Sequence, residues 1–173
     1  MPGNAVTYNS QTIYLLQTLK YPDIDYAFEN WGNNVFWRSY EVATKDGYIL
    51  TLFRIEGRSF KKRFSNHGQK GPILILHGFA NNAITWFERS DESQPVIPSQ
   101  LFAEGYDVWI GSIRGTTYSK KHLSLDPDDD DKQYWDFDNS DIAEKDLLAM
   151  LGLIHERSMT CQKISIMAVS AGT

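Results

Sequence analysis

A serine close to the end of the sequence lies in a pattern that could support nucleophilic catalysis. Residues 168–172 read AVSAG, and they end a run at 163–169 that predicts a buried strand. A serine between small residues at the end of a strand is typical of a nucleophile elbow, a sharp turn that exposes the serine hydroxyl. Small neighbours are needed there because larger side chains would clash with the backbone. The same residues also fit a strand end that leads into an ordinary loop, so Ser170 is a candidate nucleophile with a structural alternative.

A second motif could form an oxyanion hole. His77, Gly78 and Phe79 follow residues 72–76, a continuous apolar run that is typical of a strand buried on both faces. Gly78 would allow the backbone to bend, so that the N–H of Phe79 points at a developing oxyanion, and the N–H of Ala171 would be the second donor. His77 could be mistaken for a catalytic base, but its position favours orientation of the turn through hydrogen bonds.

Attack by Ser170 would also need a base, because a serine hydroxyl is scarcely nucleophilic near neutral pH. The remaining histidines are His67, His122 and His155, and all of them precede Ser170. The usual chain order around such an elbow is serine, then acid, then histidine, and only three residues follow Ser170. We therefore expect the chain as written not to turn over esters on its own.

Strands and helices alternate in the predicted fold. Residues 40–44 and 48–55 are rich in strand formers and flank an Asp46-Gly47 pair, which is a strong hairpin signal. Further strands are predicted at 72–76, 106–110 and 163–169, and helices at 98–104 and from Asn139 or Ser140 onward. This alternation indicates right-handed βαβ units. The predicted fold class is therefore α/β, with a mixed, mostly parallel sheet that begins with an antiparallel hairpin.

The same patterns predict how two parts of the chain pack. The second helix is expected to bury one apolar face, made of Ala143, Leu147, Leu151 and Ile154. Arg114 follows a predicted strand, and we expect its guanidinium to pair with an acid such as Asp107 or Asp136.

The composition excludes several classes of protein. The chain has 173 residues, of which 42% are hydrophobic and 23% are charged, as in an ordinary globular domain. A net charge of −5 leaves little for the basic face of a nucleic-acid-binding protein, and no apolar run approaches the ~18 residues of a membrane span. The single cysteine, Cys161, excludes an intramolecular disulfide and a cysteine-based zinc site. The acidic run at 126–132 fits a solvated loop better than a calcium site, so no metal or cofactor is expected.

The order and spacing of these segments resemble the acid lipases of gastric and lysosomal type. The resemblance is carried by YEVATKDGYIL at 40–50, the HGF turn at 77–79 followed by Trp86, GYDVWIGSIRGTTYSKKH at 105–122, WDF at 135–137 and Asp146. It covers residues 31–173, and the combination is far more specific than any single motif. It implies an α/β-hydrolase fold, truncated after the nucleophile elbow, and hydrolysis of lipid esters such as triglycerides or cholesteryl esters.

The resemblance also implies a role for individual residues. It makes Ser170 the nucleophile of a serine acyl-enzyme mechanism, with the backbone N–H groups of Phe79 and Ala171 as oxyanion donors. The supporting residues are His77, Gly78 and Gly172. The family usually has GHSQG where this chain has AVSAG, a difference that leaves both backbone donors in place. No cofactor, metal, nucleic acid or membrane-spanning segment is implied; the partners would be a lipid ester and, peripherally, a lipid surface.

The resemblance divides the chain into three segments. These are an N-terminal extension at 1–30, a lipase-associated region with the hairpin at 31–70, and the N-terminal half of a hydrolase core at 71–173. The favoured explanation for the incomplete catalytic set is a fragment of a longer lipase. The alternatives are a non-catalytic binding or structural subunit and a split enzyme completed by a partner. No secretion signal is visible, so a cytoplasmic location is the default, and a lysosomal or secreted one is expected if the N-terminus is incomplete.

Overall fold

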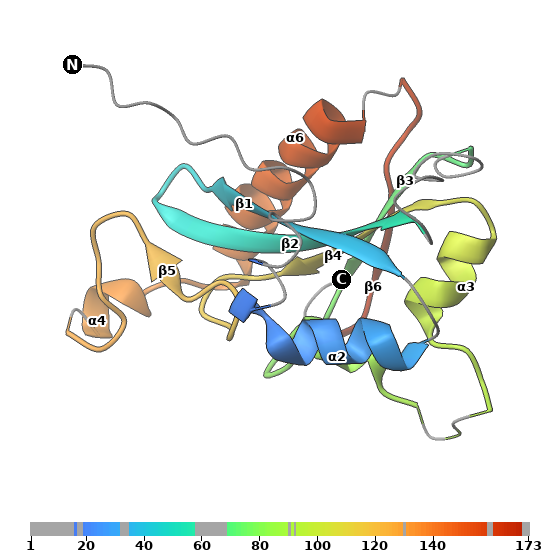
Figure 1. Ribbon diagram of the computed structural model, residues 1–173. Helices are drawn as coiled ribbons and strands as arrows, with labels where there is room; N and C mark the ends of the chain where they lie inside the picture. The colour runs from blue at the N-terminus through green and yellow to red at the C-terminus, as the bar shows by residue number, and fades with distance from the viewer. Residues whose placement is uncertain are drawn as a thin grey trace, which may run out of the picture.

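A mixed β-sheet forms the centre of the protein. The computed structural model describes residues 16, 19–31, 35–57, 69–89, 91, 93–129, 131–158 and 161–170. In this part of the chain the strands lie in the order β1 (Phe36–Ala43), β2 (Tyr48–Gly57), β4 (Asp107–Ser112), β3 (Pro72–Leu76) and β6 (Ser165–Ala168), and β5 (Lys121–His122) pairs with β2. Figure 1 shows β6 at the edge of the sheet beside β3.

The strand directions agree with the prediction of a mixed sheet. The pairs β3·β4 and β3·β6 are parallel, whereas β1·β2, β2·β4 and β2·β5 are antiparallel. The parallel part is smaller in the described strands than the sequence suggests, because β2 pairs antiparallel with every strand that it contacts. The predicted strand at 72–76 coincides with β3, and the predicted strands at 106–110 and 163–169 are β4 and β6 with shifted ends.

The predicted hairpin joins β1 to β2. Gly47 has a φ of 101°, a left-handed conformation that glycine adopts without a steric penalty. The Thr44 hydroxyl accepts a hydrogen bond of 3.0 Å from the N–H of Tyr48 and closes the turn from within. The Asp46-Gly47 signal therefore identified this turn correctly.

Helices cover both faces of the sheet (Figure 1). One face carries α2 (Pro22–Trp31), the 3₁₀ helix η1 (Ala83–Phe87) and α3 (Ile97–Ala103), and the other carries α6 (Leu147–Ser158). Two short helices, α4 (Asp131–Tyr134) and α5 (Asn139–Asp141), precede α6. Alternate residues of β3 supply the two cores: Ile73 and Ile75 face α2, and Leu74 and Leu76 face α6.

The predicted apolar face of the long helix is wrong in part. Ala143 is exposed, and the buried positions are Asp146, Met150, Leu153 and Ile154. A π-helical segment, η2 (Ile142–Asp146), lies between α5 and α6 and changes the helical phase. The N-cap is Asp138, one residue before the first of the two predicted caps, and its carboxylate accepts hydrogen bonds from the N–H groups of Ser140 and Asp141.

None of the described helices is long and apolar enough to cross a membrane. The described residues also contain no group of three or more histidine, cysteine, aspartate or glutamate side chains arranged to hold a metal ion. The division of the chain at residues 30 and 70 stays a prediction.

Candidate active site at the ends of β3 and β6

The two sequence motifs meet at the carboxyl ends of two neighbouring strands, β3 and β6. β3 and β6 are parallel and in register, with Leu76 opposite Ala168, so their carboxyl ends lie side by side. His77 and Gly78 directly follow β3, and Ser170 lies two residues beyond the end of β6. In open α/β sheets, ligand-binding residues commonly lie at the carboxyl ends of the parallel strands.

Ser170 has the backbone conformation that a sharp elbow requires. Its φ is 54°, in the left-handed region that residues other than glycine rarely adopt. Such a conformation costs of order 1–3 kcal/mol and persists only where the surrounding structure imposes it. Its two predicted neighbours in the elbow, Ala171 and Gly172, lie outside the described residues.

The backbone at Gly78 lies against the elbow. A Cβ atom added at Gly78 would be 3.0 Å from the Cβ of Ser170 and 3.2 Å from the carbonyl oxygen of Val169. Both distances are shorter than ordinary van der Waals contact. A side chain at position 78 would therefore force one of the two turns to move by a few tenths of an ångström.

The turn after Gly78 presents a backbone donor. Within the part of the chain that the structure describes, the N–H of Phe79 makes no hydrogen bond, and the Phe79 side chain is 78% exposed. Ala80 follows with a φ of 59°, and the N–H of Asn81 donates to the carbonyl oxygen of Gly78 at 3.3 Å. The turn is thus closed by its own hydrogen bond while the Phe79 N–H stays available.

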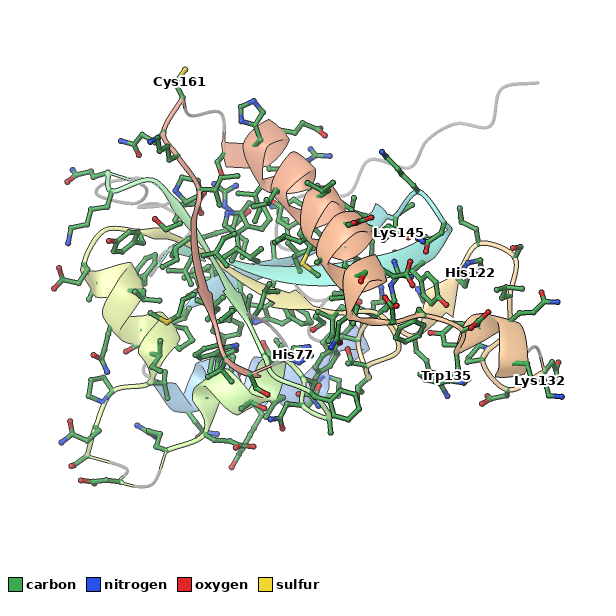
Figure 2. The ribbon with its side chains drawn as sticks, turned by 180° about the vertical axis from the view of Figure 1, so that it is seen from behind. His77, His122, Lys132, Trp135, Lys145 and Cys161 are labelled. Carbon is green, nitrogen blue, oxygen red and sulfur yellow. The ribbon has the colours of Figure 1, made fainter. Side chains whose placement is uncertain are left out.

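His77 is buried beneath this turn, and its ring is held from two sides. Nδ1 lies 2.9 Å from the carbonyl oxygen of Gly78, and Nε2 accepts a hydrogen bond of 3.3 Å from the N–H of Ile113. These partners require a neutral ring with the proton on Nδ1. Burial lowers the pKa of His77, which also favours the neutral form. Figure 2 shows this ring close to the end of β6.

The ring of His122 is also held by backbone groups, at a different place in the fold. Its Nε2 lies 2.7 Å from the carbonyl oxygen of Asp46, and its Nδ1 accepts from the N–H groups of Ser124 and Leu125. Figure 2 shows His122 on β5, well separated from His77. His155 is exposed on α6, and His67 lies outside the described residues. Both ring nitrogens of His77 and of His122 are therefore occupied by backbone groups.

A buried ionic cluster lies on the α6 side of the sheet, and the sequence did not reveal its pairing. Arg114 pairs with Asp46 (2.8 Å) and Asp146 (2.7 Å), not with Asp107 or Asp136 as expected. Asp107 instead accepts two hydrogen bonds from Arg54.

The cluster connects three segments that are distant in the sequence. The Arg114 guanidinium lies 4.1 Å from the centre of the Tyr48 ring, a distance typical of a cation–π contact. Asp146 also accepts a hydrogen bond of 2.9 Å from the Arg114 backbone N–H. The cluster thus joins the Asp46 hairpin turn, the segment after β4 and the start of α6, the helix that leads to the elbow strand.

The Asp46 carboxylate makes the stability of this cluster pH-dependent. Burial alone would raise the pKa of Asp46, but hydrogen bonds from Arg114, Thr44 and Lys145 outweigh it and hold the pKa well below its usual range. The unfolded chain, with an aspartate pKa of about 3.9, therefore binds a proton more readily than the folded protein does. The stabilisation is present above about pH 4 and is lost as the pH falls below that value.

We expect the Asp46→Asn variant to show the size of this contribution. The variant should be less stable than the natural protein at neutral pH, and the difference should shrink as the pH falls from about 5 to 2. Urea denaturation at several pH values measures it. Asp129→Asn, in an exposed loop, is the control and should follow the natural protein throughout. A difference for Asp46→Asn that stays constant with pH would contradict this account.

Comparison with known proteins connects this site to a family. A family described as a partial alpha/beta-hydrolase lipase region matches residues 24–90, which include most of α2, the hairpin, β3 and the His77 turn. Triacylglycerol lipase 2 of Arabidopsis thaliana is 36% identical over 136 residues, which are 78% of this chain and 31% of that protein. Gastric triacylglycerol lipase of Rattus norvegicus is 32% identical over 136 residues, 79% of this chain and 33% of that protein. The chain corresponds to the N-terminal part of the acid lipases.

Other comparisons support the acid lipase assignment and confirm the fold class. Lipase member K of Homo sapiens is 34% identical over 137 residues, 79% of this chain and 32% of that protein. This chain thus spans about a third of the length of these relatives. An esterase of Pyrococcus furiosus has a similar structure, with a TM-score of 0.51 and 17% identity over 80% of this chain and 43% of that chain. At that identity the likeness concerns the α/β-hydrolase fold alone.

Proposed function

We propose that the protein containing this chain hydrolyses lipid esters, with Ser170 as the nucleophile and the N–H groups of Phe79 and Ala171 as oxyanion donors. The main supporting observation is the left-handed backbone conformation of Ser170 next to Gly78. A Cβ added at position 78 would lie 3.0 Å from the Ser170 Cβ. This arrangement brings the serine and the Phe79 turn to one place, as acyl transfer requires. The names of the triacylglycerol lipase relatives favour acylglycerols as the substrate class.

The proposed reaction has two steps. The Ser170 Oγ bonds to the ester carbonyl carbon as its proton passes to a base, and the carbonyl oxygen becomes an oxyanion that accepts hydrogen bonds from the backbone donors. Collapse of this intermediate breaks the bond to the alcohol, which leaves with the proton from the base. Water then attacks the acyl-enzyme in the same way and releases the fatty acid.

His77 is proposed as a positioning residue in this reaction. Its hydrogen bonds link the Gly78 carbonyl to the N–H of Ile113, so they fix the turn that carries the Phe79 donor. Its nitrogens, like those of His122, are occupied, and neither ring is proposed as the base. The matched relatives are about three times as long as the aligned segment, so activity has to be tested on the protein at its natural length. The gastric relative favours the lysosomal or secreted alternative over a cytoplasmic location.

The proposal is tested by covalent labelling. A fluorophosphonate probe reacts with a serine that is activated by a base and an oxyanion hole. We expect one labelled peptide, which contains Ser170, and no labelling of the Ser170→Ala variant. The Ser165→Ala variant, which changes an exposed serine on β6, should be labelled as the natural protein is. Absence of labelling at Ser170 in the folded natural-length protein would favour the non-catalytic subunit instead.

The close approach of the two turns gives a second expectation. Gly78→Ala places a methyl group 3.0 Å from the Ser170 Cβ, so the elbow must shift by a few tenths of an ångström. A displacement of about 1 Å can cost about 10²-fold in rate, so for this smaller shift we expect kcat for a soluble ester to fall about threefold to tenfold. Gly152→Ala on α6 is the matched control, because a Cβ there meets nothing within 4 Å. Equal activity of the two variants would show that the contact at Gly78 has no catalytic importance.

A further inference from the structure

A cavity opens beside the proposed oxyanion turn. It has a volume of about 530 Å³ and lies between α2 and the segment that runs from β3 through η1. On the side of this segment the lining starts at Ala80, the residue directly after the Phe79 donor, and includes Asn81, Thr85 and Glu88. The volume is within the range of pockets that bind small organic ligands. A ligand group in this cavity would therefore lie next to the proposed reaction centre.

The walls of the cavity combine apolar surface with polar side chains that make no hydrogen bond among the described residues. Ile84, Phe87 and Ala27 supply apolar surface. The side chains of Asn81 and Thr85 make no hydrogen bond with any described residue, although both line the cavity. They can therefore offer an amide and a hydroxyl to a ligand. An occupant that matches these walls carries hydroxyl groups on a short hydrocarbon frame.

The charges around the cavity distinguish the two halves of an ester substrate. Asp23 and Glu88 line the cavity together with one cation, Arg89, so the charged groups sum to −1. A fatty acyl chain makes no hydrogen bonds and would desolvate these charged groups, whereas the hydroxyl groups of an alcohol can donate hydrogen bonds to the carboxylates of Asp23 and Glu88. The Asp23 carboxylate accepts a hydrogen bond from the Tyr118 hydroxyl and is thereby fixed at the cavity wall.

We propose that this cavity binds the alcohol half of the ester, and that its preferred alcohol is a polyol such as the glycerol of a monoacylglycerol. The inference rests on the proposed ester hydrolysis and adds the choice of alcohol to it. Thr85 and Asn81 are the specificity-determining residues, since each can hydrogen-bond to a hydroxyl that a simple alkyl ester lacks. A site that hydrogen-bonds a substrate hydroxyl discriminates against the analogue without it.

The test compares two substrates with the same acyl group, glycerol monobutyrate and ethyl butyrate. Thr85→Val removes the hydroxyl and keeps the shape of the side chain. We expect kcat/KM for glycerol monobutyrate to fall about threefold to tenfold, mostly through KM, with ethyl butyrate unchanged. Thr85→Ser restores the hydroxyl and should keep the natural preference. An unchanged ratio of the two substrates in Thr85→Val, or an equal loss on both, would overturn the proposal.

A binding measurement separates failure of this inference from failure of the proposed reaction. The ether 1-O-butylglycerol has the same alcohol half but cannot be hydrolysed, and it is titrated by NMR into the natural-length Ser170→Ala protein. We expect binding that Thr85→Val weakens about threefold to tenfold. If the natural protein hydrolyses neither ester, the proposed reaction is wrong, and this titration alone decides the inference. No binding of the ether, or equal affinity in both variants, overturns it.

Discussion

Replacing Ser170 with alanine is expected to reduce ester hydrolysis by about four to six orders of magnitude in the natural-length protein. The reason is that the acyl-enzyme route needs the Ser170 oxygen, while the oxyanion donors would retain only a small part of the rate acceleration. The measurement is kcat for glycerol monobutyrate or another soluble ester at saturating substrate. Circular dichroism of the variant establishes that the fold is retained.

We expect this loss of activity to be specific to position 170 and not to follow from the removal of any serine. Ser165→Ala is the matched control, because Ser165 is an exposed serine at the start of the same strand, β6. We expect its kcat to stay within twofold of the natural value, since surface changes far from a site have small effects. If Ser170→Ala retained more than about a tenth of the natural activity, Ser170 would not be the nucleophile.

The second large effect concerns stability and the buried ionic cluster. We expect Asp146→Ala to lower the free energy of unfolding by about 3–5 kcal/mol, because it leaves the Arg114 charge buried with part of its hydrogen bonding lost. Asp146 is fully buried; it accepts hydrogen bonds of 2.9 and 2.8 Å from the backbone N–H and the Nε of Arg114, and its carboxylate lies 2.7 Å from Nη2 in an ion pair. Urea denaturation followed by tryptophan fluorescence measures the change.

A surface ion pair provides the comparison for this prediction. Lys70 and Glu104 are 2.6 Å apart, but their side chains are 47% and 67% exposed. Solvent screens such pairs, so Glu104→Gln should change the unfolding midpoint very little. A loss for Asp146→Ala as small as that for Glu104→Gln would show that water or a rearranged partner compensates the Arg114 charge.

The elements that the sequence predicted well are those with strong local signals. β3 is a continuous apolar run, the hairpin has Asp46-Gly47 at its turn, and α3 has a proline in its first turn and Gly105 just past its end. Each signal acts within a few residues, so distant parts of the chain do not change it. The parallel arrangement of β3 and β6 also followed from the strand–helix alternation, and it brings the His77 and Ser170 turns together.

The features that were missed depend on contacts between distant segments. The π-helical segment before α6 rotates Asp146 into the core, where it meets Arg114, and no apolar periodicity can predict a buried carboxylate. The pairing of Arg114 with Asp46 joins residues 68 positions apart. The cavity between α2 and η1 was missed for the same reason, since its two walls are formed by different parts of the chain.

Because the backbone at Ser170 is left-handed, a substitution at this one position can raise thermostability and lower activity together. Glycine tolerates a φ of 54° without the steric cost that a side chain carries there, so Ser170→Gly should relieve strain that the natural residue imposes. The same change removes the proposed nucleophile. A screen that selects variants only for resistance to heat would therefore favour loss of function at this residue, and consensus-style stabilisation of the chain has to leave position 170 untouched.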